Sequence, residues 1–357
     1  MRINSVSHPI TAIIALAMLG ACSGRAPQMA PMTAQENIGA TTLSVQRQGL
    51  RGGPNSPSVQ KLQATEAAGR PLVFVSDYTN NVVDIYLQRR KSKMVGQITG
   101  LNSPAGLATD TAGDLYVANE FSATVPVYAP SYTKKPKLIL EDGANLPGYV
   151  AVSPKGVVGV VNACTAPSCN AYSDSVSFFA RNSTKPCVTV AANPAIFQDL
   201  IAGAFDDKGN FYIDGFNSQF AAAFGKIVGE CKAKTVETLT TGKDVDFVES
   251  IQIDRADRIA ILDGTAHTID TYDAPKKGVL GNPVSTTPLA GGPSTAPFAF
   301  AFLASGRDLY AAFYGSSSEP GAALKYDYPA GGTPEKALPL PASATPSGLA
   351  VTPPLIP

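Results

Sequence analysis

The side chains of this 357-residue chain that could do chemistry are mainly carboxylates and amides. Its two histidines, His8 and His267, are too few for a histidine-based zinc site, which needs several ring nitrogens. The sequence contains no GxSxG nucleophile elbow, no phosphate-binding P-loop and no CxxCH heme-attachment motif. Any catalysis would therefore use carboxylates, or a metal ion held by oxygen atoms.

Acidic or amide residues recur at one position of a repeated pattern, where each closes an apolar stretch such as FVSD or FYID. These residues are Asp77, Asn119, Asn162, Asp214 and Asp263. They could accept hydrogen bonds from the turn that follows, or they could ring a cation such as calcium or a polyhydroxy ligand. The first interpretation is favoured, because a residue that recurs in each unit serves the repeat itself.

Residues that break the repeat are better candidates for a specific contact. Gln198-Asp199 and Glu249-Ser250 stand where another unit has Pro104-Ala105-Gly106. Nearby loops carry aromatic residues that could stack on a sugar or on a partner's apolar side chain, or could pack within the loops. These are Phe121, Tyr172, Phe216, Phe220 and Tyr314. His267 aligns with Asn81 and Ala123, so we predict an ordinary turn residue there.

The pattern that positions these residues has a period of roughly 40 to 50 residues and consists only of strands and turns. Its clearest copy is SPAGLATDTAGDLYVANEFSATVPVY, which runs from Ser103 to Tyr128. One such sheet cannot bury both of its faces alone, so the repeat predicts an all-β fold, a six-bladed β-propeller. The first copy lacks an innermost strand, whereas PSGLAVTPP near the C-terminus resembles an unpaired one. We therefore predict that residues 348–352 pair with the strand around Val73 and close the ring.

In a blade with strands a to d from the axis outward, the b-to-c and d-to-a connections lie on one face. The b-to-c loops are enlarged at residues 164–174, 215–224 and 314–321, and the d-to-a connections also vary. The a-to-b turns, such as DTAGD and DDKGN, are short and uniform. Variation on one rim of a rigid scaffold is typical of a binding face.

The N-terminus resembles a bacterial lipoprotein signal, with Arg2, an apolar run over residues 10–19 and the lipobox-like LGAC ending at Cys22. This resemblance implies cleavage before Cys22, a lipid on that residue and, with Ser23 next, an outer-membrane address. We expect residues 1–21 to be the signal peptide, residues 22–58 a flexible tether and residues 59–357 the propeller.

Of the five cysteines, Cys22 would carry lipid, which leaves an even set for an oxidising compartment. Three connectivities are open, and we favour Cys164 with Cys169 and Cys187 with Cys231. Net charge is zero and only 16% of residues are charged. The basic run RRKSK has no interleaved aromatic residues, so nucleic acid is not an expected partner.

The strands GDLYVANEFSATVPVY and VFVSDYTNNVVDIY resemble those of NHL-repeat propellers. A more distant likeness is to gluconolactonase-like propellers, which implies that Asn119, Asn162 and Asp214 could take amide and carboxylate roles around a divalent metal. The Glu that such enzymes carry at the start of the first innermost strand is replaced here by Pro346-Ser347-Gly348.

Three hypotheses follow. The chain is a lipid-anchored, monomeric, non-enzymatic module that needs no cofactor and binds a protein, carbohydrate or other ligand through the irregular face. Alternatively, it is a calcium-type lactone or ester hydrolase using Asp214 and Asp263, or a structural envelope protein without a ligand.

Overall fold

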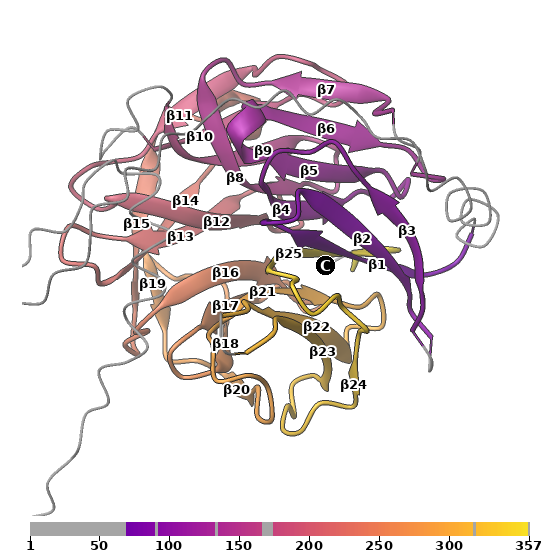
Figure 1. Cartoon of the computed structure of the whole chain (residues 1–357). Coiled ribbons are helices and arrows are strands. Elements are labelled where there is room, and N and C mark those ends of the chain that lie inside the picture. Colours follow the sequence, from indigo (N-terminus) through magenta and orange to yellow (C-terminus); the bar gives the residue numbers. More distant parts are fainter. Residues whose placement is uncertain (1–68, 90–91, 133–134, 166–173, 317–318, 356–357) are drawn as a thin grey trace, which may run out of the picture.

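The computed structural model describes residues 69–89, 92–132, 135–165, 174–316 and 319–355. The described residues form strands and two single-turn 3-10 helices, η1 (Glu120–Ser122) and η2 (Glu230–Lys232). The strands build six sheets, shown in Figure 1. The predicted all-β, six-bladed propeller is thus confirmed.

The first three blades each contain four antiparallel strands, ordered from the axis outward. Blade one has β25 (Pro346–Thr352), β1 (Leu72–Asp77), β2 (Val82–Leu87) and β3 (Met94–Ile98). Blade two has β4 (Pro104–Thr109), β5 (Leu115–Asn119), β6 (Thr124–Tyr128) and β7 (Leu138–Glu141). Blade three has β8 (Asn145–Val152), β9 (Val158–Thr165), β10 (Ser175–Phe179) and β11 (Val188–Ala191).

The last three blades follow the same plan. Blade four has β12 (Asp199–Phe205), β13 (Phe211–Phe216), β14 (Ala222–Ile227) and β15 (Val236–Thr241), with β19 (Val279–Gly281) added in parallel at its outer edge. Blade five has β16 (Val248–Ile253), β17 (Ile259–Asp263), β18 (Thr268–Tyr272) and β20 (Ser285–Pro288). Blade six has β21 (Pro297–Phe302), β22 (Asp308–Phe313), β23 (Ala322–Asp327) and β24 (Lys336–Ala337).

The two ends of the described chain close the ring. β25 pairs antiparallel with β1, in a register that runs from Leu72 opposite Thr352 to Asp77 opposite Pro346. Figure 1 shows the yellow β25 beside the indigo β1. Each innermost strand also contacts the next one around the axis, including β21 with β25. The predicted closure through residues 348–352 is therefore confirmed.

The burial of the strands changes from the inside of each blade to its outer edge. Every residue of β1, β5, β13 and β17 is buried, because a neighbouring blade covers each face of these second strands. The outermost strands β7, β11 and β20 instead bury only their third residue, which lies between two exposed ones, as expected for a half-exposed edge. The apolar core is accordingly divided into layers between adjacent blades, such as Phe74 with Leu115 between blades one and two.

The a-to-b turns form the uniform face that the sequence predicts. In blades two, four and five an aspartate opens the turn and accepts two backbone N–H groups through Oδ1: Asp110, Asp206 and Asp254. In blade three Ser153 Oγ accepts the N–H of Val157. These side chains replace backbone partners at the turn, which explains their recurrence.

A disulfide between Cys187 and Cys231 joins blades three and four, as predicted. Cys187 precedes β11 and Cys231 lies in η2, so the bond ties the outer strands of two neighbouring blades. Cys164 is also disulfide-bonded, and its predicted partner Cys169 lies outside the described residues. Bridges that close loops of this size stabilise a fold by about 2 to 4 kcal/mol.

The predictions for the signal peptide, Cys22, the tether and Tyr172 also fall outside the described residues. Among the residues that are described, no helix is both long enough and apolar enough to cross a membrane.

We expect Gly348→Ala to destabilise the propeller. A Cβ at Gly348 would lie 2.3 Å from the carbonyl oxygen of Ala105 and 2.8 Å from Oγ of Ser76, at the junction of blades one and two. The resulting displacement should lower the free energy of unfolding by about 1 to 3 kcal/mol, measured by urea denaturation. Gly148→Ala in β8 is the matched control, because its Cβ would find no heavy atom closer than 3.9 Å. Equal midpoints for the two variants would contradict a tight closure.

Candidate functional site

The face formed by the b-to-c and d-to-a connections, here called the loop face, has a cavity of about 150 Å³ at its centre. All six blades contribute to this central cavity, so it lies on the propeller axis. Its lining residues are Tyr78, Ala105, Glu120, Gly148, Tyr149, Ala163, Asp174, Asp199, Leu200, Ile201, Phe216, Phe247, Glu249, Phe298 and Ser347. The predicted sharing of one face by the two kinds of connection is borne out by this set.

A β-bulge near the start of each innermost strand builds the wall. In all six blades the register between strands a and b shifts there, at a point where strand a carries one extra residue. In blade three strand b also carries an extra residue, Ala163. A bulge leaves the extra residue unpaired and redirects its side chain. The bulge residues that line the cavity are, from blade one to blade six, Ser347, Ala105, Gly148, Ile201, Glu249 and Phe298. Glu249 is the one charged member of this set.

Glu249 is held in the wall without a hydrogen-bonding partner for one of its oxygens. Its side chain is only 4% exposed, and Oε1 is buried with no donor in reach. Burial raises the pKa of this carboxyl well above its usual value, and the charge of nearby Asp214 raises it further. A buried carboxyl oxygen without a donor is costly, so Oε1 of Glu249 is an atom that a ligand could satisfy.

Three further carboxyls line the cavity, those of Glu120, Asp174 and Asp199. Asp174 accepts the N–H of Leu200 through Oδ2 at 2.6 Å, yet burial raises its pKa to about 8. The charge of Asp199 contributes to that rise, and burial raises the pKa of Asp199 as well. Among the described residues that line the cavity, none is a lysine, an arginine or a histidine. The ionisable carboxyls of the cavity therefore face no basic side chain among the described lining residues, and burial favours their protonated form.

Glu120 is oriented by the hydroxyl of Tyr78, which donates to Oε2 at 3.0 Å. Tyr78 comes from the b-to-c turn of blade one, and Glu120 lies in η1, in the corresponding turn of blade two. The ring of Phe121 stands edge-on to that of Tyr78, with centroids 6.4 Å apart, and is 46% exposed. The contact links the floor of the cavity to an exposed aromatic residue on the loop face.

Aromatic rings supply the apolar part of the wall. Phe216 and Phe247 pack with ring centroids 5.0 Å apart, and Phe298 packs on Tyr314 at 5.5 Å. The hydroxyl of Tyr149 accepts a hydrogen bond from Nε2 of Gln252 at 2.6 Å. It also lies 3.4 Å from Oγ of Ser250. These contacts fix the Tyr149 ring against the cavity.

Among the residues predicted from broken repeats, Asp199 and Glu249 line the cavity and Ser250 supports it from behind. Gln198 donates its backbone N–H to the carbonyl of Phe216 and is not a lining residue. Phe216 is buried in the wall, whereas Phe220 is 50% exposed in the b-to-c loop of blade four.

The five repeat residues do not line the central cavity. Asp77 and Asp263 accept hydrogen bonds from the turn that follows, as the structural interpretation expects. Asn119 Oδ1 accepts the N–H of Asn102 at 2.6 Å, and Asp214 Oδ1 accepts that of Ala202 at 2.8 Å. Asn162 donates to Asp142 at 2.8 Å. Each side chain therefore joins backbone segments or strands within the blades.

Two of these positions also differ from the prediction that they end strand b. β9 continues to Thr165 and β13 to Phe216, beyond Asn162 and Asp214. Both precede enlarged b-to-c loops, in which the extra residues prolong the strand pairing. The carboxyl of Asp214 is consequently enclosed, and burial raises its pKa to about 7.

His267 occupies the turn position that the alignment predicts. Its φ of 52° matches those of Asn81 at 59° and Ala123 at 52°. Burial lowers the pKa of the His267 imidazole. The centroids of the His267 and Phe313 rings are 6.0 Å apart.

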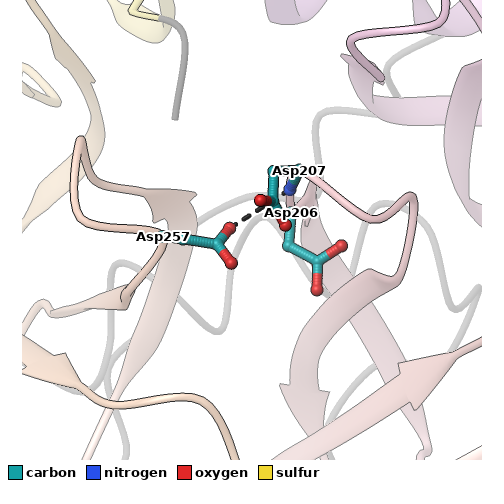
Figure 2. A group of neighbouring side chains, drawn as sticks. All are labelled: Asp206, Asp207 and Asp257. Atoms are coloured by element: carbon teal, nitrogen blue, oxygen red, sulfur yellow. Dashed lines mark hydrogen bonds between the residues drawn. The ribbon is translucent and has the colours of Figure 1, made fainter.

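Acidic groups that the repeat analysis did not single out occur away from the cavity. Figure 2 shows Asp206, Asp207 and Asp257 from the a-to-b turns of blades four and five. Lys208 Nζ contacts both Asp207 and Asp257, so a resident ammonium already balances this group. Lys325 does the same for Asp308 and Glu335, which form a second group with Asp327. Within the described residues, the cavity carboxyls do not converge as these two groups do.

Glu120 and Asp174 are the cavity acids that the sequence analysis missed. Glu120 directly follows the repeat residue Asn119, and Asp174 ends the enlarged loop of blade three. A search for acids beside the recurrent positions would have found Glu120, and a search of the enlarged loops would have found Asp174.

No protein-family model matches the chain, and no curated protein matches it. Solved structures are similar in fold. A chain of a nidogen–laminin complex has a TM-score of 0.59 at 11% identity, over 79% of this chain and 98% of that chain. A protein of unknown function from Bacteroides caccae has 0.56 at 13%, over 79% and 99%. A candidate 6-phosphogluconolactonase from Bacteroides fragilis has 0.53 at 13%, over 76% and 82%. At such identities the likeness establishes the propeller alone.

The raised pKa values predict that the protein is more stable in mildly acidic than in mildly alkaline solution. Folded Asp174 and Asp214 keep their protons up to pKa values of about 8 and about 7, whereas unfolded aspartates lose theirs near about pH 4. The unfolded state therefore binds fewer protons in between, and the free energy of unfolding falls as pH rises from about 5 to 8. The expected slope is up to about 1.4 kcal/mol per pH unit for each group.

Urea denaturation at several pH values tests this expectation. Asp214→Asn keeps the oxygen that accepts the Ala202 N–H and removes the titrating group, so its slope should be shallower. Asp244→Asn, at an exposed position, should retain the slope of the natural protein. A stability that rises over the same range would show that these carboxyls are ionised in the folded protein.

Proposed function

We propose that this chain is a bacterial envelope lipoprotein whose propeller acts as a ligand- or protein-binding module through the loop face. The single observation that carries the proposal is the central cavity, into which every blade sends a bulge residue and in which Glu249 has an unsatisfied oxygen. Rigid scaffolds commonly bind at an axial opening lined with apolar rings and a few polar groups.

The exposed rings around the cavity support the same face. Phe121 and Phe220 are 46% and 50% exposed, and both belong to b-to-c connections. Phe220 adopts a φ of 57°, a conformation that bulky residues seldom take. The b-to-c turns of other blades have the same conformation at Asn81, Ala123 and His267, so it belongs to the turn, and the support for the loop face is the exposure of the two rings. The nidogen–laminin complex is an example of this fold within a protein–protein assembly.

The envelope address rests on the lipobox-like LGAC and on the disulfides, which need an oxidising compartment. We propose a lipid on Cys22 and an outer-membrane location on these grounds. The tether at residues 22–58 would hold the propeller away from the lipid surface.

The lactone or ester hydrolase alternative has less support. Asn119, Asn162 and Asp214, which the resemblance would place around a metal, are engaged in hydrogen bonds within the blades. The cavity acids do not form a converging group of three among the described residues. We therefore favour binding over hydrolysis as the role of the loop face.

Filling the cavity should abolish binding without unfolding the protein. Ala163 is a partly exposed lining residue, so Ala163→Phe places a ring in the cavity. We expect small molecules that raise the melting temperature of the natural protein, found by a thermal-shift screen of metabolites and envelope extracts, to lose their effect on this variant. Ala151→Phe, in a cavity of about 130 Å³ lined by residues of the opposite, a-to-b side, is the matched control.

A ligand that stabilises both variants alike would bind elsewhere, and the central cavity would not be the site. If no ligand stabilises the natural protein and affinity capture through the loop face finds no partner, the structural role in the envelope becomes the better hypothesis.

A further inference from the structure

We propose that the central cavity binds a small organic ammonium ion with an apolar body, and that Glu249 is its principal counter-ion. This inference rests on the proposed binding function and specifies the class of ligand. It follows from three independent features of the cavity, namely its charge, its unsatisfied oxygen and its aromatic wall.

The charge of the lining favours a cation. Asp174, Asp199 and Glu249 share the cavity, and none of the described residues that line it is basic. The acid groups elsewhere on the propeller are different, because Lys208 and Lys325 supply an ammonium to each. A positively charged group from a ligand is therefore the complement that these described lining residues lack.

Glu249 marks where the ammonium would lie. Its Oε1 is buried without a donor, and its side chain is 4% exposed at the bulge position of blade five. The other five bulge positions carry the uncharged residues Ser347, Ala105, Gly148, Ile201 and Phe298. The bulge therefore needs no acid for folding, and an N–H donor from a ligand would satisfy the orphaned oxygen.

The rest of the wall suits an organic ion better than a metal. Phe216, Phe247 and Phe298 offer apolar surface, and the faces of aromatic rings attract ammonium groups. Divalent metals instead need several oxygens converging on one point. The described residues offer such convergence at the two groups that lysines already occupy, and not in the cavity.

Binding should be coupled to proton release. The titratable groups that surround Glu249 across the cavity and behind it are Asp214, Asp199, Asp174, Glu120, Tyr149 and Tyr78. Because burial raises the pKa of Glu249, its carboxyl is protonated before the ligand binds. An ammonium group beside it would favour the ionised carboxylate. The proton leaves to solvent as the ion pair forms, so affinity should increase as pH rises.

Isothermal titration of the full chain with three matched probes tests the proposal. Phenethylamine is cationic, 2-phenylethanol is neutral and phenylacetate is anionic, although all three share one aromatic body. We expect phenethylamine to bind at least about tenfold more tightly than 2-phenylethanol, and phenylacetate not to bind. Titrations in buffers of different ionisation enthalpy should reveal proton release with phenethylamine alone.

Glu249→Gln preserves the size of the side chain and removes its charge. It should weaken phenethylamine binding by at least about tenfold, abolish most of the proton release and leave 2-phenylethanol binding unchanged. Glu237→Gln, at an exposed position of β15, should match the natural protein in every titration. The melting temperatures of both variants establish that they are folded.

Equal affinity for the cationic and neutral probes would overturn the proposal, as would undiminished phenethylamine binding by folded Glu249→Gln. A third outcome is that no probe binds, but a different ligand raises the melting temperature of the natural protein and not that of Ala163→Phe. This outcome would refute the ammonium ligand and leave the proposed binding function intact. If Ala163→Phe removes no effect either, both proposals fail.

Discussion

The antiparallel pairing of β25 with β1 is the constraint on which the remaining structure depends. Without it blade one would lack its innermost strand, and the sheet edge of β1 would be open. The pairing also reaches the next blade, because Ser76 Oγ donates to the carbonyl of Ala105 at 2.6 Å and lies 3.0 Å from Ser347 Oγ. Closure thus fixes the positions of six inner strands relative to one axis.

A fixed ring allows its inner strands to carry irregular starts. Each bulge interrupts the backbone hydrogen bonding between the first and second strands near the loop face, while the remainder of the strand stays paired with its neighbour. The apolar core between the blades is built mainly by other strand residues, although the bulge residue Ile201 also packs against it. This arrangement explains how a buried acid with an unsatisfied oxygen can be accommodated at the centre of a stable fold.

The architecture could be predicted from the sequence because the strand and turn pattern recurs at a nearly constant spacing. The spacing of the strands predicted six blades, and the unpaired PSGLAVTPP predicted closure. Asp199 and Glu249 could be identified because they interrupt that pattern. Their convergence with Glu120 and Asp174 could not, since the four residues belong to four different blades and come together only because the closed ring places those blades around one axis. The recurrent Asp and Asn residues were candidates for a ring of ligands around the axis. The hydrogen bonds show that Asn119 and Asp214 instead bind backbone N–H groups of their own blades.

Because each bulge residue belongs to a different blade, the wall of the cavity consists of six separately encoded pieces. A substitution at one of them alters a single sector and leaves the ladder of every other blade untouched. The composition of the wall can therefore be altered one sector at a time, by a change at the start of a single inner strand.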